Sequence, residues 1–521
     1  MNGLDYIIIV LYILAFLLFG RLFKESKSGD DYFLGGKSFG WGALSLSTVA
    51  TQLSAISFIS APAFVGLREG GGLIWLTYEL AVPLAMLFLM LVLIPPLYKA
   101  GIVSVYQYLE ERYSVSTRIL LSTVFQVSRA FATSVMVYTV ALILTSVMDI
   151  PMWQTILIIG VVTLVYSYQG GMKAVVYGDV VQMIILFGGI IICLVAGVNL
   201  VGGWSAFIDT VETDRLTAIN FQDMGLSKGS EFGFFPMLIG GFFLYASYYG
   251  TDQSQVQRLF SAKDQKTVRQ TLVCNGLMRF PITLTYCVMG LVIGTAVLSN
   301  PSFRAAIPAD KPDMMMPIFI RDYLPHGIIG ILMVAIFSAA MSSLSSAINS
   351  LSAASVEDYL NRDGQLSDEE HVRYSKYAAL FWGILCIVLA FFTGDIADTV
   401  IEAINKIGSV FYGPILATFF AAICVKTVNS KGINVGILVG VAVNVYLWLF
   451  VPEVFWFWWN AIGAVTTLAV AYLASRLMPS QEIQAETDSG DWSVSSSSVL
   501  LLVGMFVLIV VLSYFMPSIF G

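Results

Sequence analysis

Apolar runs of about twenty residues recur along the whole chain, and they constrain its fold more than any other feature. Residues 433–451 and 497–517 are two examples. A helix of about 20 apolar residues crosses the hydrocarbon core of a bilayer, whereas the strands of a membrane barrel alternate and give no such runs. Only 12% of the residues are charged, against about 25% in soluble domains. The sequence therefore predicts an all-α polytopic membrane protein and excludes a soluble enzyme or a disordered chain.

The apolar runs predict about fourteen membrane spans. Their approximate limits are 5–22, 42–65, 73–98, 117–147, 152–168, 176–201, 233–251, 270–298, 327–353, 374–393, 399–424, 433–451, 455–475 and 497–517. The first is interpreted as a membrane helix rather than a signal peptide, because Asp5 precedes it and no basic segment does. Lys and Arg are roughly threefold more frequent in the loops that follow odd-numbered spans. That bias predicts that these loops are cytoplasmic and that both chain ends lie outside.

Several other features narrow the function. The five cysteines lie inside apolar stretches, so neither a disulfide nor a metal site is expected from them. No nucleotide-binding loop is present, which disfavours an ATP-driven pump, and no basic tract suggests nucleic acid. The outer loops 202–232 and 299–326 are long enough for short interfacial helices, and residues 478–497 form a Ser-rich acidic linker.

Six ionisable residues lie within the predicted spans, where each costs roughly 2.5–3.5 kcal/mol to insert. They are Glu79, Arg129, Asp179, Arg279, Glu402 and Lys406. Asp179 is near the cytoplasmic start of its span and could be interfacial. For Arg129, an ion pair with Glu79 and a substrate-binding role are both open. Glu402 and Lys406 are four residues apart on one helix face and are expected to pair with each other.

The most specific pattern lies in the ninth span. Ser338, Ser342, Ser345 and Asn349 recur at helical spacing and form one polar stripe, which Ser343 and Ser346 widen. Small residues and hydroxyls also occur where membrane helices pack closely. Two Ser-Ser pairs and an Asn within eight positions nevertheless favour a site for a weakly held hard cation such as Na⁺, which prefers oxygen ligands.

Polar residues interrupt two apolar spans that are five spans apart. The second span is interrupted between Thr48 and Ser57 and contains Pro62, and the seventh is interrupted between Phe242 and Asp252. Broken helices at matching positions of two halves indicate an inverted-repeat transporter, whose unwound backbone lines a binding cavity. Spans 2–6 and 7–11 are then the two repeats.

The chain resembles the sodium/solute symporters, the family that includes the sodium–glucose cotransporters. The resemblance runs along the chain and is carried by Asp30-Asp-Tyr-Phe-Leu-Gly-Gly-Lys, Tyr168-Gln-Gly-Gly-Met-Lys with Asp179 and Gln182, Asp252-Gln-Ser-Gln-Val-Gln-Arg-Leu, Ala339 to Ser350, and Gly408 to Pro414. It implies the LeuT-type five-plus-five inverted repeat, which agrees with the repeat inferred from the broken spans.

The resemblance also implies ion and substrate positions. The main sodium site would use Ala50, Leu53, Ala339, Ser342 and Ser343. A second sodium site, as in the bacterial sialic acid symporters, would use Asp179, Ser342, Ser345 and Ser346. The positions that line the substrate pocket of relatives are Gln52, Ser54, Ser57, Tyr78, Glu79, Arg129, Phe243, Tyr245, Tyr248, Arg279 and Asn405.

Three of these pocket positions bear on the substrate. Tyr248 resembles the aromatic residue beneath the sugar in the galactose symporter, and Glu79 resembles an acceptor for sugar hydroxyls there. Arg129 resembles the arginine that holds the carboxylate in sialic acid symporters, and a guanidinium can grip a carboxylate with two donors. A sugar or sugar acid is thus the expected substrate. The negative charge of Glu79 would repel an anion bound close to it.

The expected function is sodium-coupled symport of a small polar organic solute, driven by one or two Na⁺ without an organic cofactor. The alternatives are an organic-anion symporter (for a monocarboxylate or vitamin), a channel and a transporter-like sensor; a membrane enzyme is not expected. The protein is expected to be a monomer in the lipid of a cell membrane. Its short loops favour a bacterial inner membrane. The expected regions are 1–41 (first helix and inner loop), 42–201 (first repeat), 202–232 (outer loop), 233–425 (second repeat) and 426–521 (added helices).

Overall fold

The computed structural model describes residues 1–23, 28–53, 55–309, 311–393, 400–479 and 492–520, apart from the side chains of residues 55–56 and 400–405. Helices make up most of the described part of the chain, and the only extended pairing in that part is an isolated bridge between Phe39 and Ala262. The predicted all-α fold is therefore confirmed for these residues.

The helices fall into three groups by length. The long helices are α1 (Gly3–Phe19), α8 (Val115–Met148), α9 (Met152–Val201), α13 (Gln265–Ser299), α16 (Ile328–Ser355), α17 (Asp368–Ala390), α18 (Val400–Cys424), α19 (Ser430–Phe450), α20 (Trp456–Leu477) and α21 (Ser496–Phe520). The shorter helices are α2 (Gly29–Leu34), α3 (Trp41–Gln52), α4 (Ala55–Gly66), α5 (Val82–Phe88), α6 (Ile94–Lys99), α7 (Gln107–Arg112), α10 (Trp204–Thr210), α11 (Gly241–Thr251), α12 (Gln253–Phe260), α14 (Pro301–Ala306) and α15 (Met315–Tyr323). Short 3-10 helices are η1 (Gly20–Phe23), η2 (Gly35–Lys37), η3 (Leu73–Glu79), η5 (Thr213–Leu216) and η7 (Pro312–Met314), and single π-helical turns are η4 (Leu89–Leu93), η6 (Pro236–Gly240) and η8 (Val356–Leu360).

Eleven described helical segments are long and apolar enough to cross a membrane, or up to 12 if α3 and the part of α4 from Ser57 count as one bent span. One of them, α9, has 50 residues, which corresponds to about 75 Å and to two crossings. Its backbone leaves the helical region at Gly171, where φ is 50° and ψ is −143°. This break separates the predicted fifth and sixth spans. Fourteen crossings remain a prediction.

The two predicted helix breaks are present. Helices α3 and α4 form the second span and are bent by 59°. In the seventh span α11 ends at Thr251, Asp252 adopts an extended conformation with φ −80° and ψ 120°, and α12 starts at the next residue. Both breaks expose backbone groups at matching positions of the two halves, as an inverted repeat requires.

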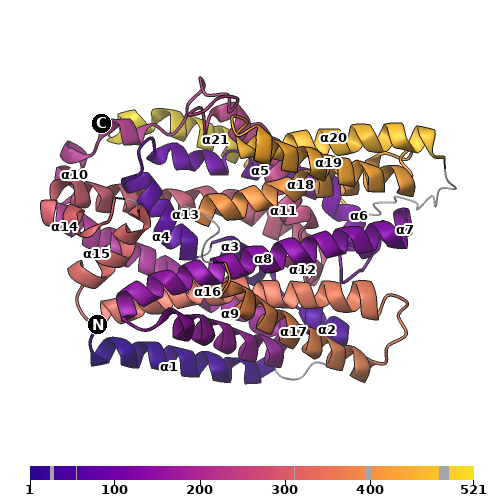
Figure 1. Ribbon diagram of the computed structural model, residues 1–521, viewed down its shortest axis with the longest axis horizontal. Coiled ribbons are helices and arrows are strands. Elements are labelled where there is room, and N and C mark those ends of the chain that lie inside the picture. Colours follow the sequence, from indigo (N-terminus) through magenta and orange to yellow (C-terminus); the bar gives the residue numbers. More distant parts are fainter. Residues whose placement is uncertain (24–27, 54, 310, 394–399, 480–491, 521) are drawn as a thin grey trace.

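Most helices run roughly along one direction, and both chain ends lie at the same end of this bundle (Figure 1). The short helices α10, α14 and α15 lie at that end as well. They occupy the two long loops predicted to lie outside, and residues 480–491 of the predicted linker lie outside the described residues.

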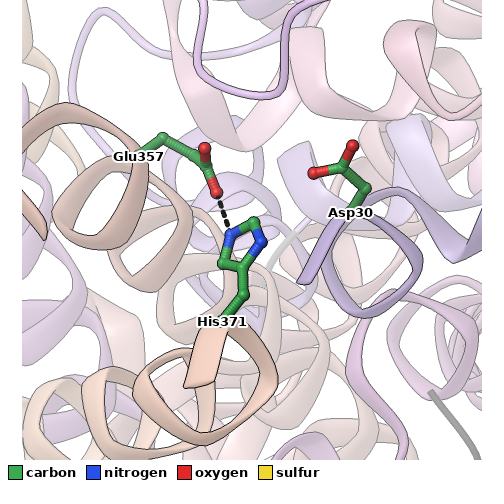
Figure 2. A group of neighbouring side chains, drawn as sticks. All are labelled: Asp30, Glu357 and His371. Atoms are coloured by element: carbon green, nitrogen blue, oxygen red, sulfur yellow. Dashed lines mark hydrogen bonds and ion pairs between the residues drawn. The ribbon is translucent and has the colours of Figure 1, made fainter. Parts of the chain in front are cut away.

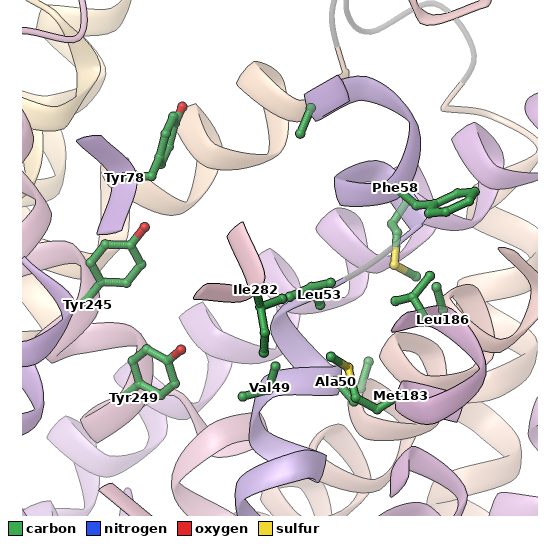
Figure 3. Close-up of a cluster of buried hydrophobic side chains, with 14 of the residues drawn as sticks. Val49, Ala50, Leu53, Phe58, Tyr78, Met183, Leu186, Tyr245, Tyr249 and Ile282 are labelled. Carbon is green, nitrogen blue, oxygen red and sulfur yellow. The ribbon is translucent and has the colours of Figure 1, made fainter. Parts of the chain in front are cut away.

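Helix α3 lies at the centre of the bundle, where it packs against α9, α13 and α16. Figure 3 shows Val49 and Ala50 of α3 and the next labelled residue, Leu53, with Tyr245 and Tyr249 on one side and Met183 on the other. Leu53 follows the last residue of α3 and is itself extended, with φ −80° and ψ 91°. The helix break therefore sits in the middle of the buried core.

Candidate functional site

A cavity of about 220 Å³ lies beside the two helix breaks. Its wall is built from α3, α4, η3, α8, α11, α12, α13, α16 and α18, so both repeats contribute to it. The lining residues include Thr51, Gln52, Ser57, Trp75, Tyr78, Glu79, Arg129, Thr133, Tyr245, Tyr248, Asp252, Arg279, Tyr286, Ser343, Ser346 and Tyr412. Aromatic rings and hydroxyls alternate with four charged side chains on this wall.

Most residues expected to bind substrate line this cavity. They are Gln52, Ser57, Tyr78, Glu79, Arg129, Tyr245, Tyr248 and Arg279. Phe243 does not line it; the Phe243 ring packs edge-on against Phe242 with centroids 5.7 Å apart. Ser54 and the side chains of Asn405 and Glu402 lie outside the described residues. The expected Glu402–Lys406 pair therefore stays a prediction.

The negative charge of Glu79 is neutralised by Arg279 of α13. Its two carboxylate oxygens accept from Arg279 Nη2 at 2.7 Å and Arg279 Nε at 3.2 Å, and the Thr283 hydroxyl donates to Oε1 at 2.8 Å. Glu79 is 1% exposed and Arg279 7% exposed. This closed pair reduces the repulsion that a free carboxylate would exert on an anion in the cavity.

Arg129 pairs with Asp252, not with Glu79, so the alternative of a Glu79–Arg129 ion pair is wrong. The Arg129 Nη2 donates to Asp252 Oδ2, and the guanidinium also lies 5.7 Å from the centre of the Tyr248 ring. Asp252 is held in turn by the backbone N–H and the hydroxyl of Ser254. The Arg129 side chain is 17% exposed, so it can be reached from the cavity.

Aromatic side chains complete the wall. The Tyr248 ring contacts the Tyr412 ring edge-on at 6.1 Å, and its hydroxyl accepts from Gln255 Nε2 at 2.9 Å. Trp75 Nε1 donates to the Tyr286 hydroxyl at 3.1 Å. The Tyr249 hydroxyl donates to Gln52 Oε1. These bonds fix ring orientations, so the cavity has preorganised stacking surfaces.

The residues of the expected main sodium site lie where α3 breaks beside α16. Ala50 and Leu53 are buried at the end of α3, and Ala339 and Ser342 are buried on α16. The Ser343 hydroxyl lines the cavity and has no hydrogen-bond partner among the described residues. A buried hydroxyl oxygen without a partner is costly unless a ligand satisfies it. Ser342 differs, because its hydroxyl donates to Asp179 Oδ1 at 2.6 Å.

The expected second sodium site surrounds Asp179, which is fully buried inside the protein. Ser47 donates to Asp179 Oδ2 at 2.5 Å, and Arg258 Nη2 donates to the same oxygen at 2.8 Å. The Arg258 guanidinium also contacts Ser346 and Ser47. Ser345 instead donates to the backbone oxygen of Ser342 at 2.9 Å. A guanidinium therefore holds the carboxylate that a second sodium would need.

Three residues of the site were missed by the sequence reasoning: Asp252, Arg258 and Tyr412. Asp252 and Arg258 both belong to the motif Asp252-Gln-Ser-Gln-Val-Gln-Arg-Leu, and two charged residues at and just after the second helix break were an available signal. Asp252 accepts from the Ser254 N–H and caps α12, which is a common role for Asp. Tyr412 carries no such signal, because aromatic residues are frequent in all spans.

A carboxylate in the loop between α14 and α15 contacts the broken second span. Asp313 of η7 accepts from the Ser60 hydroxyl of α4 at 3.1 Å. Burial raises the pKa of Asp313, while the Ser60 hydrogen bond and the charge of Arg68 oppose that shift. The loop between α14 and α15 is thereby attached to α4.

The model of the sodium:solute symporter family matches residues 32–440. The human sodium/iodide cotransporter is 28% identical over 425 residues, which cover 81% of this chain and 65% of that protein. Bovine sodium-coupled monocarboxylate transporter 2 is 28% identical over 447 residues, 85% of this chain and 69% of that protein. The matches thus span about two thirds of the length of these relatives.

A solved structure, the substrate-bound outward-open state of a Na⁺-coupled sialic acid symporter, superposes with a TM-score of 0.82. It is 26% identical and covers 92% of this chain and 98% of that one. A match of this extent confirms the expected five-plus-five architecture, in which the two broken spans face each other at the centre.

Proposed function

Because the chain belongs to the sodium:solute symporter family, we propose that it imports a small carboxylate-bearing solute together with sodium by alternating access. The matched proteins are transporters, and the chain is a multi-pass membrane protein rather than an enzyme. The leading substrate class is a sugar acid. We place the protein in a bacterial inner membrane as a functional monomer, with both ends outside.

One observation carries the carboxylate proposal: Arg129 faces the cavity while Glu79 is fully engaged by Arg279. A guanidinium offers five donors in a planar fork, so Arg129 can take a substrate carboxylate beside its contact with Asp252, or in place of it. The hydroxyls of Ser57, Thr133 and Tyr245 would meet the hydroxyls of a sugar acid, and Tyr248 would stack on its ring.

A simple monocarboxylate is the second candidate, and two observations favour it. The cavity of about 220 Å³ is smaller than the roughly 300–1,000 Å³ of pockets for drug-sized ligands. One relative is named for monocarboxylates, and the iodide and sialic acid in the names of the others are also anions at neutral pH. A neutral sugar fits this pattern less well than either acid.

Sodium would bind where α3 breaks, between the carbonyls of Ala50, Leu53 and Ala339 and the hydroxyls of Ser342 and Ser343. An ion there joins α3 to α16 and stabilises the arrangement in which the cavity wall is complete. When α16 moves away from α3, the ion loses ligands from one side and its affinity falls. Sodium and substrate stabilise the same state, which is the thermodynamic requirement for coupling.

The position of Arg258 supports a stoichiometry of one sodium. Its guanidinium already neutralises Asp179 and contacts Ser346, two of the four residues of the expected second site. A second sodium would have to displace a buried cation that is 2% exposed. We therefore propose that the Arg258 guanidinium takes the place of a second sodium ion there. The dependence of the uptake rate on sodium concentration should then have a Hill coefficient near one. A coefficient near two would favour a second sodium instead.

Uptake into proteoliposomes tests the substrate class. Purified protein would be given an inward sodium gradient and radiolabelled glucuronate, sialic acid, lactate or galactose. We expect sodium-dependent accumulation of an acid above its equilibrium level, which a channel or a sensor cannot produce. Accumulation of galactose alone would contradict the carboxylate proposal while leaving sodium coupling intact.

The variant Arg129→Gln tests the assigned residue. We expect it to abolish uptake of the acid, and Arg129→Lys to restore it only in part, because an ammonium lacks the planar fork. Arg304→Gln is the matched control, since Arg304 is exposed in α14 and does not line the cavity. Normal acid uptake by Arg129→Gln would refute the role of Arg129.

A further inference from the structure

A histidine and two carboxylates from distant parts of the chain meet away from the transport cavity. They are Asp30 in α2, Glu357 in η8 and His371 in the first turn of α17. One possible ligand atom from each lies within 4.8 Å of the others. Figure 2 shows the three side chains converging, with the His371 ring between the carboxylates of Glu357 and Asp30. None of the three lines the cavity.

The imidazole is held in place by its surroundings. His371 is 6% exposed, and its Nε2 lies 2.6 Å from Glu357 Oε1, which belongs to a residue that is 3% exposed. The ring lies directly over Gly29, where a Cβ atom would come within 2.3 Å of it. Phe33 contacts the ring edge-on at 6.4 Å. Two of the three potential ligands are thus buried and oriented, and the exposed Asp30 side chain is free to rotate towards them.

We propose that Asp30, Glu357 and His371 bind a divalent transition-metal ion of the zinc class. Imidazole nitrogen and carboxylate oxygen are ligands for such ions, at about 2.0–2.2 Å from the metal. Tetrahedral ligands at these distances lie about 3.4 Å apart. The Nε2–Oε1 separation of 2.6 Å therefore widens by less than 1 Å, while the Asp30 carboxylate rotates inward. Water completes the coordination.

The metal would tie three segments that are far apart in sequence. Helix α2 packs against α9, α12 and α17, and η8 continues α16, the helix that carries the serine stripe. A shared ion would add a bond between the loop after the first span and the end of α16. This tether is independent of sodium and substrate, so its test does not depend on the proposed transport activity.

The experiment uses zinc itself and full-length purified protein carrying a tag without histidine. The chain has only two histidines, so a histidine-dependent metal site can be assigned by substituting each. We expect zinc to raise the Tm in a saturable way, and Co²⁺ in its place to give visible absorption bands typical of nitrogen and oxygen ligands. Zinc should also slow hydrogen exchange of residues 29–34.

His371→Gln and Asp30→Asn should each weaken the apparent zinc affinity more than about tenfold, because losing even a partner outside the ligand shell costs roughly 10–100-fold. Asp30 is exposed, so its variant removes a ligand without disturbing a buried pair. His326→Gln is the matched control: His326 Nδ1 lies 3.0 Å from Asp5 Oδ2, another histidine–carboxylate pair. The proposal is overturned if zinc does not raise the Tm, or if the zinc response survives in His371→Gln or is lost in His326→Gln.

Discussion

The hydroxyl of Ser343 is the sharpest single test of the main sodium site. It is buried, lines the cavity and has no hydrogen-bond partner among the described residues, so its oxygen is available to an ion. We expect Ser343→Ala to raise the sodium concentration for half-maximal uptake by at least about tenfold, which corresponds to a loss of roughly 1.4 kcal/mol. Measuring the uptake rate against sodium concentration, at saturating substrate, gives the sodium concentration for half-maximal uptake.

Ser350→Ala is the matched control on the same helix. Ser350 is also buried in α16, but its hydroxyl donates to the Ala347 carbonyl at 3.1 Å and does not face the cavity. It should leave the sodium dependence unchanged. Equal effects of the two substitutions would show that packing of α16, rather than ion ligation, explains the loss.

The Glu79–Arg279 pair makes a stability prediction. Glu79→Gln leaves a buried guanidinium without its carboxylate, and breaking a buried pair in this way costs about 3–5 kcal/mol. We expect the Tm of the purified protein to fall markedly. The double variant Glu79→Gln with Arg279→Met should recover most of the Tm, because it removes both charges. A single variant as stable as the native protein would show that the pair contributes little.

The sequence reveals these charged residues but not their partners. An ionisable group inside an apolar span is conspicuous, and Glu79, Arg129 and Arg279 were all identified on that basis. The partners are 123 residues apart for Arg129 and Asp252, and 200 for Glu79 and Arg279. Pairing over such separations depends on how the spans pack, which apolar periodicity does not specify. For that reason the sequence left a Glu79–Arg129 pair open, whereas Glu79 pairs with Arg279.

Close packing of α4 on α13 depends on glycines at their contact. A Cβ at Gly290 would lie 2.7 Å from the Pro62 Cα, and one at Gly294 would lie 2.5 Å from the Gly66 Cα. These neighbours are backbone atoms and cannot rotate away, so Gly290→Ala forces the two helices apart. Because α4 is half of the broken span beside the cavity, we expect both lower thermal stability and slower uptake.

Gly188→Ala in α9 provides the comparison. Nothing lies within 4 Å of a Cβ at Gly188, so alanine fits there and should be neutral or stabilising by up to about 1 kcal/mol. Thermal unfolding and uptake would be measured for both variants. If Gly290→Ala behaves like Gly188→Ala, the α4–α13 contact is more compliant than its geometry indicates.

Helix breaks were predicted more reliably than helix ends. Polar residues within the second and seventh spans located both interruptions, because they occur at matching positions of the two halves. The end of the fifth span was misplaced: the polar stretch around Tyr168 to Lys173 reads as a loop, yet the helix runs on to Gly171, where the backbone breaks, and resumes directly after it. Glycine adopts the positive φ of Gly171 without strain, and a Cβ at this position would lie 2.5 Å from the Tyr32 carbonyl oxygen.

At the scale of the whole molecule, three pairs of buried opposite charges lie in or beside the cavity among the described residues. Glu79 pairs with Arg279, Arg129 with Asp252 and Asp179 with Arg258. A neutral interior can accept one cation together with one anion without leaving an uncompensated charge in a low-dielectric medium. This balance is lost if either the ion or the substrate binds alone, which gives each a reason to favour binding of the other.

The same balance predicts how uptake responds to membrane potential. One Na⁺ that crosses with one monovalent carboxylate moves no net charge, whereas two Na⁺ with that anion would move one charge and gain roughly 2.3 kcal/mol per 100 mV. If Arg258 occupies the place of a second ion, imposing a potassium diffusion potential on proteoliposomes should leave the initial rate of acid uptake nearly unchanged. The sodium gradient alone should drive accumulation. A large acceleration by an inside-negative potential, with two Na⁺ counted per substrate, would instead mean that Arg258 leaves Asp179 during the cycle and that a second ion takes its place.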